Sequence, residues 1–285
     1  LYSQVFHKEI TLAESEEIAA ASEGWITGLL LTSPLLRSGL GEPVKIARTS
    51  GIGLYEYLAQ QVLNQQPKEI QDFLLYSSIL EEFNAEMCRK VIGQALDVEA
   101  DWPRLMETVY HNNLFVLPLD EEYRWLRYHH LFRDFLQSTL LQRRPQDAQK
   151  VKLQLAVYAR ENQDWERVFN IYRQLGRKDA IADLIKEVGP HFIAKGQIKK
   201  LSAWLDELSL AQINSDAALL SIKASVTFNQ GRLQQGKQML DQVVDMYRKS
   251  GDERNLASNL IRRSAAQRVL GDYDNALADA EEAIH

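Results

Sequence analysis

The sequence predicts a mostly α-helical protein in which a winged-helix module with a short β-hairpin precedes an α–α superhelix of tetratricopeptide-like repeats. Three observations lead to this fold class. Apolar residues recur at helical spacing through most of the chain, one short segment alternates with the period of a β-hairpin, and a glycine-centred turn returns at a spacing typical of stacked helical units. With 285 residues, the chain is long enough for two or three domains.

The first hundred residues carry helix signals only. Thr11 can cap a helix, with Glu14 as the reciprocal partner of a capping box, and helices are expected over 12–22 and 25–31. Gly and Pro cluster between Pro34 and Gly53, which indicates a connection. A further helix is expected after Pro67, burying side chains that recur at helical spacing: Ile70, Phe73, Leu74 and Ser77.

The stretch from Trp102 to Leu141 has the order of elements found in winged-helix domains. A helix should begin at Pro103 and bury Leu105, Met106, Val109 and Tyr110. Residues 115–119 and 124–128 then read as two strands of a hairpin, the second alternating Arg127 against Leu126 and Tyr128. Helical spacing resumes at Leu131.

From about Asp147 onward the sequence shows a recurring turn and no strand signal. The turn appears as Gly196-Gln-Ile, Gly231-Arg-Leu and Gly271-Asp-Tyr, at spacings of 35 and 40 residues. Weaker versions begin at Asn162 and Gly176. Such a period predicts helix–turn–helix units stacked into a solenoid, and the unit around Gly271 fits a tetratricopeptide repeat.

The charge balance argues against direct nucleic-acid binding. Residues 66–144 contain nine Lys or Arg against thirteen Asp or Glu, and the formal net charge of the chain is −6. The helix that would read DNA, Pro103–Asn113, carries Arg104 and Glu107 without a basic cluster, whereas phosphate contacts need clustered Lys and Arg. We therefore expect no direct contact with DNA or RNA.

Composition and motifs also narrow the other function classes. There is one cysteine, Cys88, no secretory signal and no apolar stretch long enough to span a membrane, so a cytoplasmic protein without a membrane partner is expected. The sequence contains no phosphate-binding loop, nucleophile elbow or His-Glu-x-x-His motif, so we expect no catalytic residues and no enzyme activity in this chain. Cys88 lies in an apolar helical context and is expected to pack.

His129 and His130 form the one cluster with a chemical interpretation. As neighbours on a strand, the two side chains are expected to point to opposite faces, which makes a metal site a poor interpretation. The simplest expectation is a hairpin end where one imidazole packs and the other is solvated.

Three segments, in order, resemble the MalT-like, LuxR-associated family of STAND signal-transduction ATPases. They are 23–31 (EGWITGLLL), 113–120 with 128–136 (NLFVLPLD and YHHLFRDFL), and 187–197 followed by 201–208. The resemblance implies an upstream AAA+-like ATPase core that would bind ADP or ATP with Mg²⁺ and would be a partner of this chain. The chain itself would bind no cofactor. We expect residues 1–50 to be the trailing segment of that core, 51–145 the winged-helix arm, and 146–285 an incomplete helical-repeat sensor in a protein that continues past His285.

The resemblance also implies roles for particular residues in the resting state, where the arm is clamped onto ADP. Aligning the segment with the Met-His-Asp motif of related receptors puts His129 on the phosphate-contacting histidine, while His130 replaces the aspartate. Gly28 and Leu30 align with a Gly-Leu-Pro-Leu motif that packs on adenine, with Leu30 in place of the proline. For Leu30, simple core packing stays open as the alternative.

The inducer, a peptide, protein or small molecule, is expected on the concave face of the superhelix, which the first helix of each unit lines. Counting from Gly231 and Gly271 places two sets of residues there: Ser221, Ser225, Phe228 and Asn229 in one unit, and Ser258, Ile261, Ala265 and Arg268 in the next. Arg268 would be the charge partner of an anionic ligand. Phe228 and Ile261 could instead be inter-helix core.

The sequence leaves two rival functions open. One is a DNA-binding winged-helix protein with a protein-interaction tail, which the acidic balance disfavours. The other is a plain repeat scaffold, which the segments at 23–31 and 128–136 disfavour.

Overall fold

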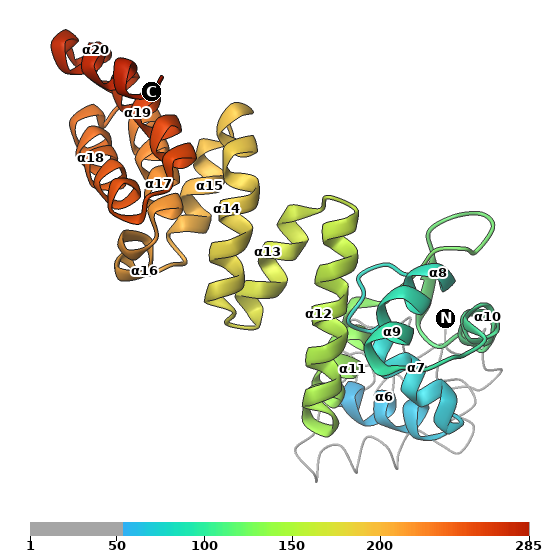
Figure 1. Cartoon of the computed structure of the whole chain (residues 1–285). Coiled ribbons are helices and arrows are strands. Elements are labelled where there is room, and N and C mark those ends of the chain that lie inside the picture. The colour runs from blue at the N-terminus through green and yellow to red at the C-terminus, as the bar shows by residue number, and fades with distance from the viewer. Residues whose placement is uncertain (1–53, 285) are drawn as a thin grey trace, which may run out of the picture. The chain divides into compact units, whose positions relative to one another are not determined.

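The computed structural model describes residues 54–284, in two compact units divided between Tyr158 and Ala159 (Figure 1). The division falls inside one helix, α12, whereas the sequence placed a domain boundary at residue 145; that boundary stays a prediction. The segment expected at 1–50, with Gly28 and Leu30, lies outside the described residues. The described part confirms the predicted fold class, a small winged-helix hairpin followed by helical repeats.

The first unit consists of short helices around a two-stranded antiparallel sheet. Its elements are α6 (Leu54–Asn64), α7 (Lys68–Ser77), α8 (Ala85–Cys88), η1 (Arg89–Gly93), α9 (Gln94–Leu96), α10 (Trp102–His111), β1 (Val116–Pro118), β2 (Leu126–Tyr128), α11 (His130–Arg143) and α12 (Pro145–Glu161). Helix η1 is a π-helical turn that joins α8 to α9. Cys88 is buried at the end of α8, as predicted, and burial raises the pKa of its thiol.

Helix α10 begins at Trp102, one residue before the predicted start at Pro103. The Asp101 carboxylate accepts a hydrogen bond from the Arg104 amide at 3.2 Å, and Pro103 occupies the first turn. Leu105, Met106 and Val109 are buried as predicted, whereas Tyr110, which was also predicted to be buried, is half-buried.

Strand β2 is hydrogen-bonded along both edges. On one side it pairs with β1 in the register Val116↔Tyr128 to Pro118↔Leu126. On the other, the Phe83 amide donates to the Leu126 carbonyl at 2.9 Å and the Leu126 amide donates back at 3.0 Å. This bridge supplies the remaining strand of a winged-helix sheet in its shortest form. The sequence did not predict it, because one bridging residue leaves no alternating pattern.

Both strands are shorter than the predicted 115–119 and 124–128. Phe115 has a positive φ of 57°, so the chain is not extended there. At the other end the Asp120 carboxylate accepts hydrogen bonds from the amides of Arg124 (2.7 Å) and Trp125 (3.2 Å) and closes the loop early.

A buried polar network joins α7, β2 and α11. The Ser77 hydroxyl donates to the Phe73 carbonyl (2.5 Å), so the Tyr128 hydroxyl, 2.6 Å away, is the donor to Ser77 Oγ. The carbonyl of Ser78, the next residue, accepts from Arg133 Nε (3.1 Å) and Gln137 Nε2 (2.6 Å) on α11. The end of α7 is thereby tied to both the strand and the following helix.

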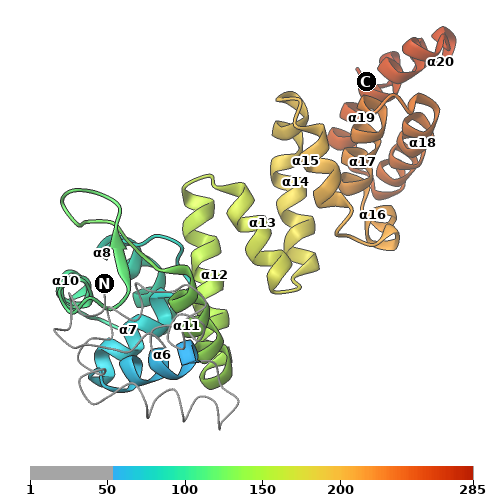
Figure 2. The ribbon, with the colours of Figure 1, turned by 180° about the vertical axis from the view of Figure 1, so that it is seen from behind.

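The second unit is built from antiparallel helices (Figures 1 and 2). They are α13 (Trp165–Gln174), α14 (Lys178–Ala194), α15 (Ile198–Leu205), α16 (Leu210–Ser215), α17 (Ala217–Asn229), α18 (Leu233–Ser250), α19 (Glu253–Leu270) and α20 (Tyr273–Glu282). Every predicted turn lies between two helices and contains a residue with positive φ: Gln163, Gly176, Gly196, Gly231 and Gly271. Glycine adopts this left-handed conformation without a steric penalty, which explains why four of the five turns carry it.

The regular hairpins begin only at α17. Between Gly196 and Gly231 the chain forms α15, α16 and α17, because a capping box at Ser209 and Gln212 starts the extra six-residue helix. Asp216 then ends α16 and caps α17, accepting from the Ala218 and Leu219 amides. The spacing of 35 residues therefore does not mark a two-helix repeat, whereas the 40 residues from Gly231 to Gly271 do.

We predict an asymmetric response when the Ser77–Tyr128 hydrogen bond is cut. Ser77→Ala leaves the buried Tyr128 hydroxyl as a donor without an acceptor and should cost about 1–3 kcal/mol of unfolding free energy. Tyr128→Phe leaves Ser77 still bonded to Phe73 and should cost about 1 kcal/mol. Urea unfolding of the two single variants and the double variant measures both costs.

In the double variant the second substitution should add little, because the unpaired donor is gone. Thr108→Ala, which removes a half-exposed hydroxyl bonded to the Arg104 carbonyl, is the control and should change stability by less than about 0.5 kcal/mol. Fully additive costs in the double variant would contradict the assignment of Tyr128 as donor.

Candidate functional sites in the wing and the repeats

His129 is held by its backbone at the point where β2 passes into α11. Its amide donates to the Phe115 carbonyl at 2.8 Å, and its own carbonyl accepts from the Arg133 amide at 3.0 Å. With φ of −56° and ψ of 135° it is the residue that caps the N-terminus of α11. The side chain is half-buried. The position of the imidazole is therefore set by the sheet on one side and the helix on the other.

The expectation that His129 and His130 point to opposite faces is wrong. Their ring centroids lie 4.5 Å apart with an angle of 33° between the planes. The reason is that β2 ends at Tyr128, so the alternation of a strand no longer applies when the chain turns into α11. His129 is half-buried and His130 is exposed, as expected for one packed and one solvated imidazole.

Burial and one neighbouring histidine lower the pKa of His129 from its ordinary value near 6.5. The larger cause is burial, which disfavours the charged imidazolium, and the smaller is the positive charge that His130 can carry. His129 is consequently neutral at pH 7 and offers one N–H donor and one acceptor nitrogen.

The surface that a DNA-binding winged helix would use is acidic here. A groove of about 820 Å³ runs between α10 and the hairpin loop, and the rings of Tyr110 and Tyr123 on it have centroids 4.6 Å apart and planes tilted by 38°. Glu86, Glu107 and Glu122 line the groove against a single arginine, Arg124. Because duplex DNA presents a dense row of phosphates, this distribution of charge opposes its approach.

Four of the residues predicted for the concave face line one groove in the second unit: Ser225, Phe228, Asn229 and Ala265. Ser225, Phe228 and Asn229 of α17 face a cavity of about 290 Å³ that also has walls from α14, α18 and α19. Phe228 is half-buried and packs against the apolar cluster of Ala224, Leu240 and Ala266, so it both lines the groove and supports it. The exposed Asn229 amide donates to the Ser225 carbonyl at 2.8 Å.

The expectation that Ser221 faces the groove has to be corrected. Its side chain is 3% exposed, lies 2.5 Å from Asn259 Oδ1 and accepts from Arg262 Nη1 at 2.9 Å. A hydroxyl that bonds two residues of α19 is part of the interface between α17 and α19. The sequence hid this role, because a serine at an inner helix position looks the same whether it faces solvent or a polar partner.

The cation of the groove is Arg262, which sequence reasoning missed. Arg268 and Ile261, which were predicted for this face, are exposed and do not line this cavity. The alternative prediction that Ile261 is part of the inter-helix core is wrong as well, because the exposed fraction of its side chain is 59%. Arg262 lies four residues after Ser258 and three before Ala265, both predicted for this face. That helical spacing was the signal that could have identified it.

Within residues 54–284, the structure brings together no cluster of three or more His, Cys, Asp or Glu that could hold a metal ion. None of the described helices is long and apolar enough to cross a membrane.

The first unit is a winged-helix domain by its order of helices, hairpin and bridging strand. Residues 59–148 match the family described as the MalT winged helix domain. The chain is 25% identical to the HTH-type transcriptional regulator MalT of Vibrio parahaemolyticus serotype O3:K6 over 217 residues, which are 76% of this chain and 23% of that protein.

Other relatives match shorter stretches. MalT of Cronobacter sakazakii is 30% identical over 130 residues, 44% of this chain and 14% of that protein. The serine/threonine-protein kinase PknK of Mycobacterium tuberculosis (strain ATCC 25618 / H37Rv) is 27% identical over 131 residues, 45% and 11% respectively. The chain spans about a quarter of the length of the Vibrio regulators. It is a MalT-like segment, and its residues 59–148 match the MalT winged helix domain.

We predict that His129 titrates below pH 6.5, because burial and His130 both disfavour its charged form. Since the unfolded chain then binds the proton more readily, His129 destabilises the fold as pH falls from about 6.5 through its folded pKa. NMR titration of the imidazole Cε1–H signals gives the pKa directly.

His130→Gln should raise the pKa of His129 only part of the way, because burial, the larger cause, remains. His129→Gln should make the loss of stability between about pH 7 and pH 5 smaller than in the parent chain. A pKa at or above 6.5 in the unsubstituted chain would overturn this description of the site.

Proposed function

We propose that this chain is the arm and sensor portion of a ligand-gated STAND regulator of transcription that works in the cytoplasm. The match of residues 59–148 to the MalT winged helix domain carries the proposal. The MalT relatives, described as transcriptional regulators, support it over most of the chain. In the whole protein an upstream ATPase core would bind ADP or ATP with Mg²⁺, and this chain would regulate it without being an enzyme.

The winged-helix arm has the surface of a protein-binding module. Glu86, Glu107 and Glu122 line the groove where a DNA-reading protein would carry Lys and Arg. The hairpin loop adds Glu121, which is also exposed. We infer that the partner of this arm is the nucleotide-binding module of the same protein, and the alternative of direct DNA binding is disfavoured.

His129 is the residue of this arm that would contact the nucleotide. A neutral imidazole can donate one hydrogen bond to a phosphate oxygen, and the backbone bonds to Phe115 and Arg133 fix its position. Phosphate charge raises the pKa of a nearby imidazole, opposite to the effect of burial here. A diphosphate could therefore convert His129 to the charged form and strengthen the contact.

The inducer would bind in the groove of the second unit. An apolar wall that includes Phe228, the amide of Asn229 and the guanidinium of Arg262 suit a peptide, protein segment or small molecule with an anionic group. Gly28 and Leu30, aligned with the adenine-contacting motif, complete the proposed nucleotide contacts.

The proposal predicts that His129→Ala in the full-length protein speeds ADP release and raises transcriptional output without inducer. A charge-assisted hydrogen bond is worth about 1.5–3 kcal/mol, so its loss should change the ADP dissociation rate about tenfold or more. Stopped-flow release of a fluorescent ADP analogue and a reporter assay measure the two effects.

His191→Ala is the control, because His191 is an exposed histidine on α14, outside the winged-helix arm and its acidic groove. It should leave both values unchanged. His130 is unsuitable as a control, since its ring lies against that of His129. An unaltered ADP release rate in His129→Ala would count decisively against the nucleotide contact.

A further inference from the structure

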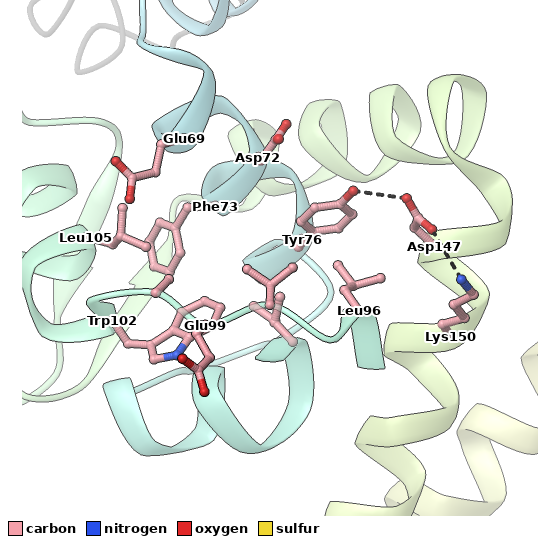
Figure 3. Close-up of a pocket in the computed structure, with 13 residues that line it drawn as sticks. Glu69, Asp72, Phe73, Tyr76, Leu96, Glu99, Trp102, Leu105, Asp147 and Lys150 are labelled. Atoms are coloured by element: carbon pink, nitrogen blue, oxygen red, sulfur yellow. Dashed lines mark hydrogen bonds and ion pairs between the residues drawn. The ribbon is translucent and has the colours of Figure 1, made fainter. Parts of the chain in front are cut away.

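The first unit contains a cavity that the proposed function does not use. It has a volume of about 350 Å³ and lies between α7, the segment that leads into α10, and the first turns of α12 (Figure 3). Most of its floor is aromatic or aliphatic: Phe73, Tyr76, Ile92, Leu96, Trp102 and Leu105. This size and lining are typical of sites for small organic ligands.

The aromatic floor is fixed by close packing. A Cβ on Gly93 would lie only 3.3 Å from the Trp102 indole and 3.2 Å from the Val98 carbonyl. Because glycine has no Cβ, the indole can pack closely against the backbone of η1. On its other side, Trp102 contacts Phe73 with ring centroids 6.4 Å apart. The floor is therefore formed before any ligand arrives, which lowers the entropic cost of binding.

The charged residues around the cavity are mainly acidic. Two of the carboxylates are compensated inside the unit. Asp72 pairs with Lys68 (2.6 Å) and Arg144 (3.0 Å), while Asp147 accepts from the Tyr76 hydroxyl (3.0 Å) and lies 3.9 Å from Lys150.

The other two carboxylates are Glu69 on α7 and Glu99 in the segment before α10 (Figure 3). Both are exposed, and neither forms an ion pair with any residue in the described part of the chain. A cavity with an aromatic floor and two uncompensated carboxylates attracts a cation and repels an anion.

We propose that this cavity binds an organic amine, with the apolar body of the ligand on Trp102, Phe73 and Leu105 and its ammonium group beside Glu69 or Glu99. Dispersion and apolar burial supply affinity from the floor. The carboxylates and the faces of the aromatic rings select a positive charge. This site is independent of the nucleotide and inducer contacts proposed above.

The test uses three soluble probes of similar shape and different charge: phenethylamine, 2-phenylethanol and phenylacetate. Each is titrated into the 285-residue chain while the indole N–H signal of Trp102 is followed by NMR, assigned with Trp102→Phe. Phenethylamine should shift this signal saturably and bind most tightly, 2-phenylethanol more weakly, and phenylacetate least.

Carboxylate variants locate the charge recognition. Glu69→Gln and Glu99→Gln should each weaken phenethylamine binding about two- to fivefold, the range of exposed charge pairs, and leave 2-phenylethanol unaffected. Glu121→Gln, at an exposed position of the hairpin loop outside the cavity, should change neither. Because all three positions are exposed, these variants should fold normally.

Two results would overturn the proposal. One is the absence of a saturable Trp102 shift with phenethylamine, which would mean that the cavity binds no such ligand. The other is equal affinity for the amine and the alcohol in the parent chain and both Gln variants, which would leave only a site for neutral apolar molecules.

Discussion

The pairing of β2 along both of its edges is the constraint on which the first unit depends. Leu126, the first residue of the strand, is fully buried, exchanges two backbone hydrogen bonds with Phe83 and pairs with Pro118 on the opposite side. Tyr128 then ties the strand to α7 through Ser77. Strand β2 is thus part of the core, although only three residues of each strand pair.

The same constraint positions the histidine that we propose as the nucleotide contact. His129 follows directly after Tyr128, and its amide extends the ladder by bonding the Phe115 carbonyl. A shift of one residue in the register of β2 would exchange the buried and exposed faces of the strand and move the imidazole. The backbone of residues 126–129 therefore connects the fold to the proposed nucleotide contact. The acidic groove on α10 does not depend on it.

Much of the fold could be predicted because its signals are local. Helix α10 has a capping aspartate and a first-turn proline, and the turns at Gly176, Gly196, Gly231 and Gly271 need a left-handed residue. The Phe83 bridge and the extra helix α16 were missed for the opposite reason. A bridge depends on a partner 43 residues away, and a six-residue helix has too few positions to show a period.

The candidate sites were harder to predict, because side-chain direction depends on where each element ends. His129 and His130 were assigned to opposite faces on the assumption that the strand alternation continued through them. Strand β2 ends at Tyr128, one residue before His129. In the repeats, Ser225 and Asn229 of α17 line the groove. On α19, Ile261 was predicted for this face, but the residue that lines the groove is its neighbour Arg262. The burial of Ser221 could not be predicted, because it depends on the hydrogen bond to Asn259 on α19, and helical periodicity does not identify partners on another helix.

If this winged helix is a protein-contacting arm, it should have no appreciable affinity for DNA. Fluorescence anisotropy of a labelled random-sequence duplex, titrated with the chain at low and at physiological salt, measures that affinity. Because the side chains along α10 and the hairpin loop are acidic, we expect no binding at micromolar protein concentration at either salt. Tight binding that weakens steeply with salt, as release of several counterions from phosphates requires, would contradict it.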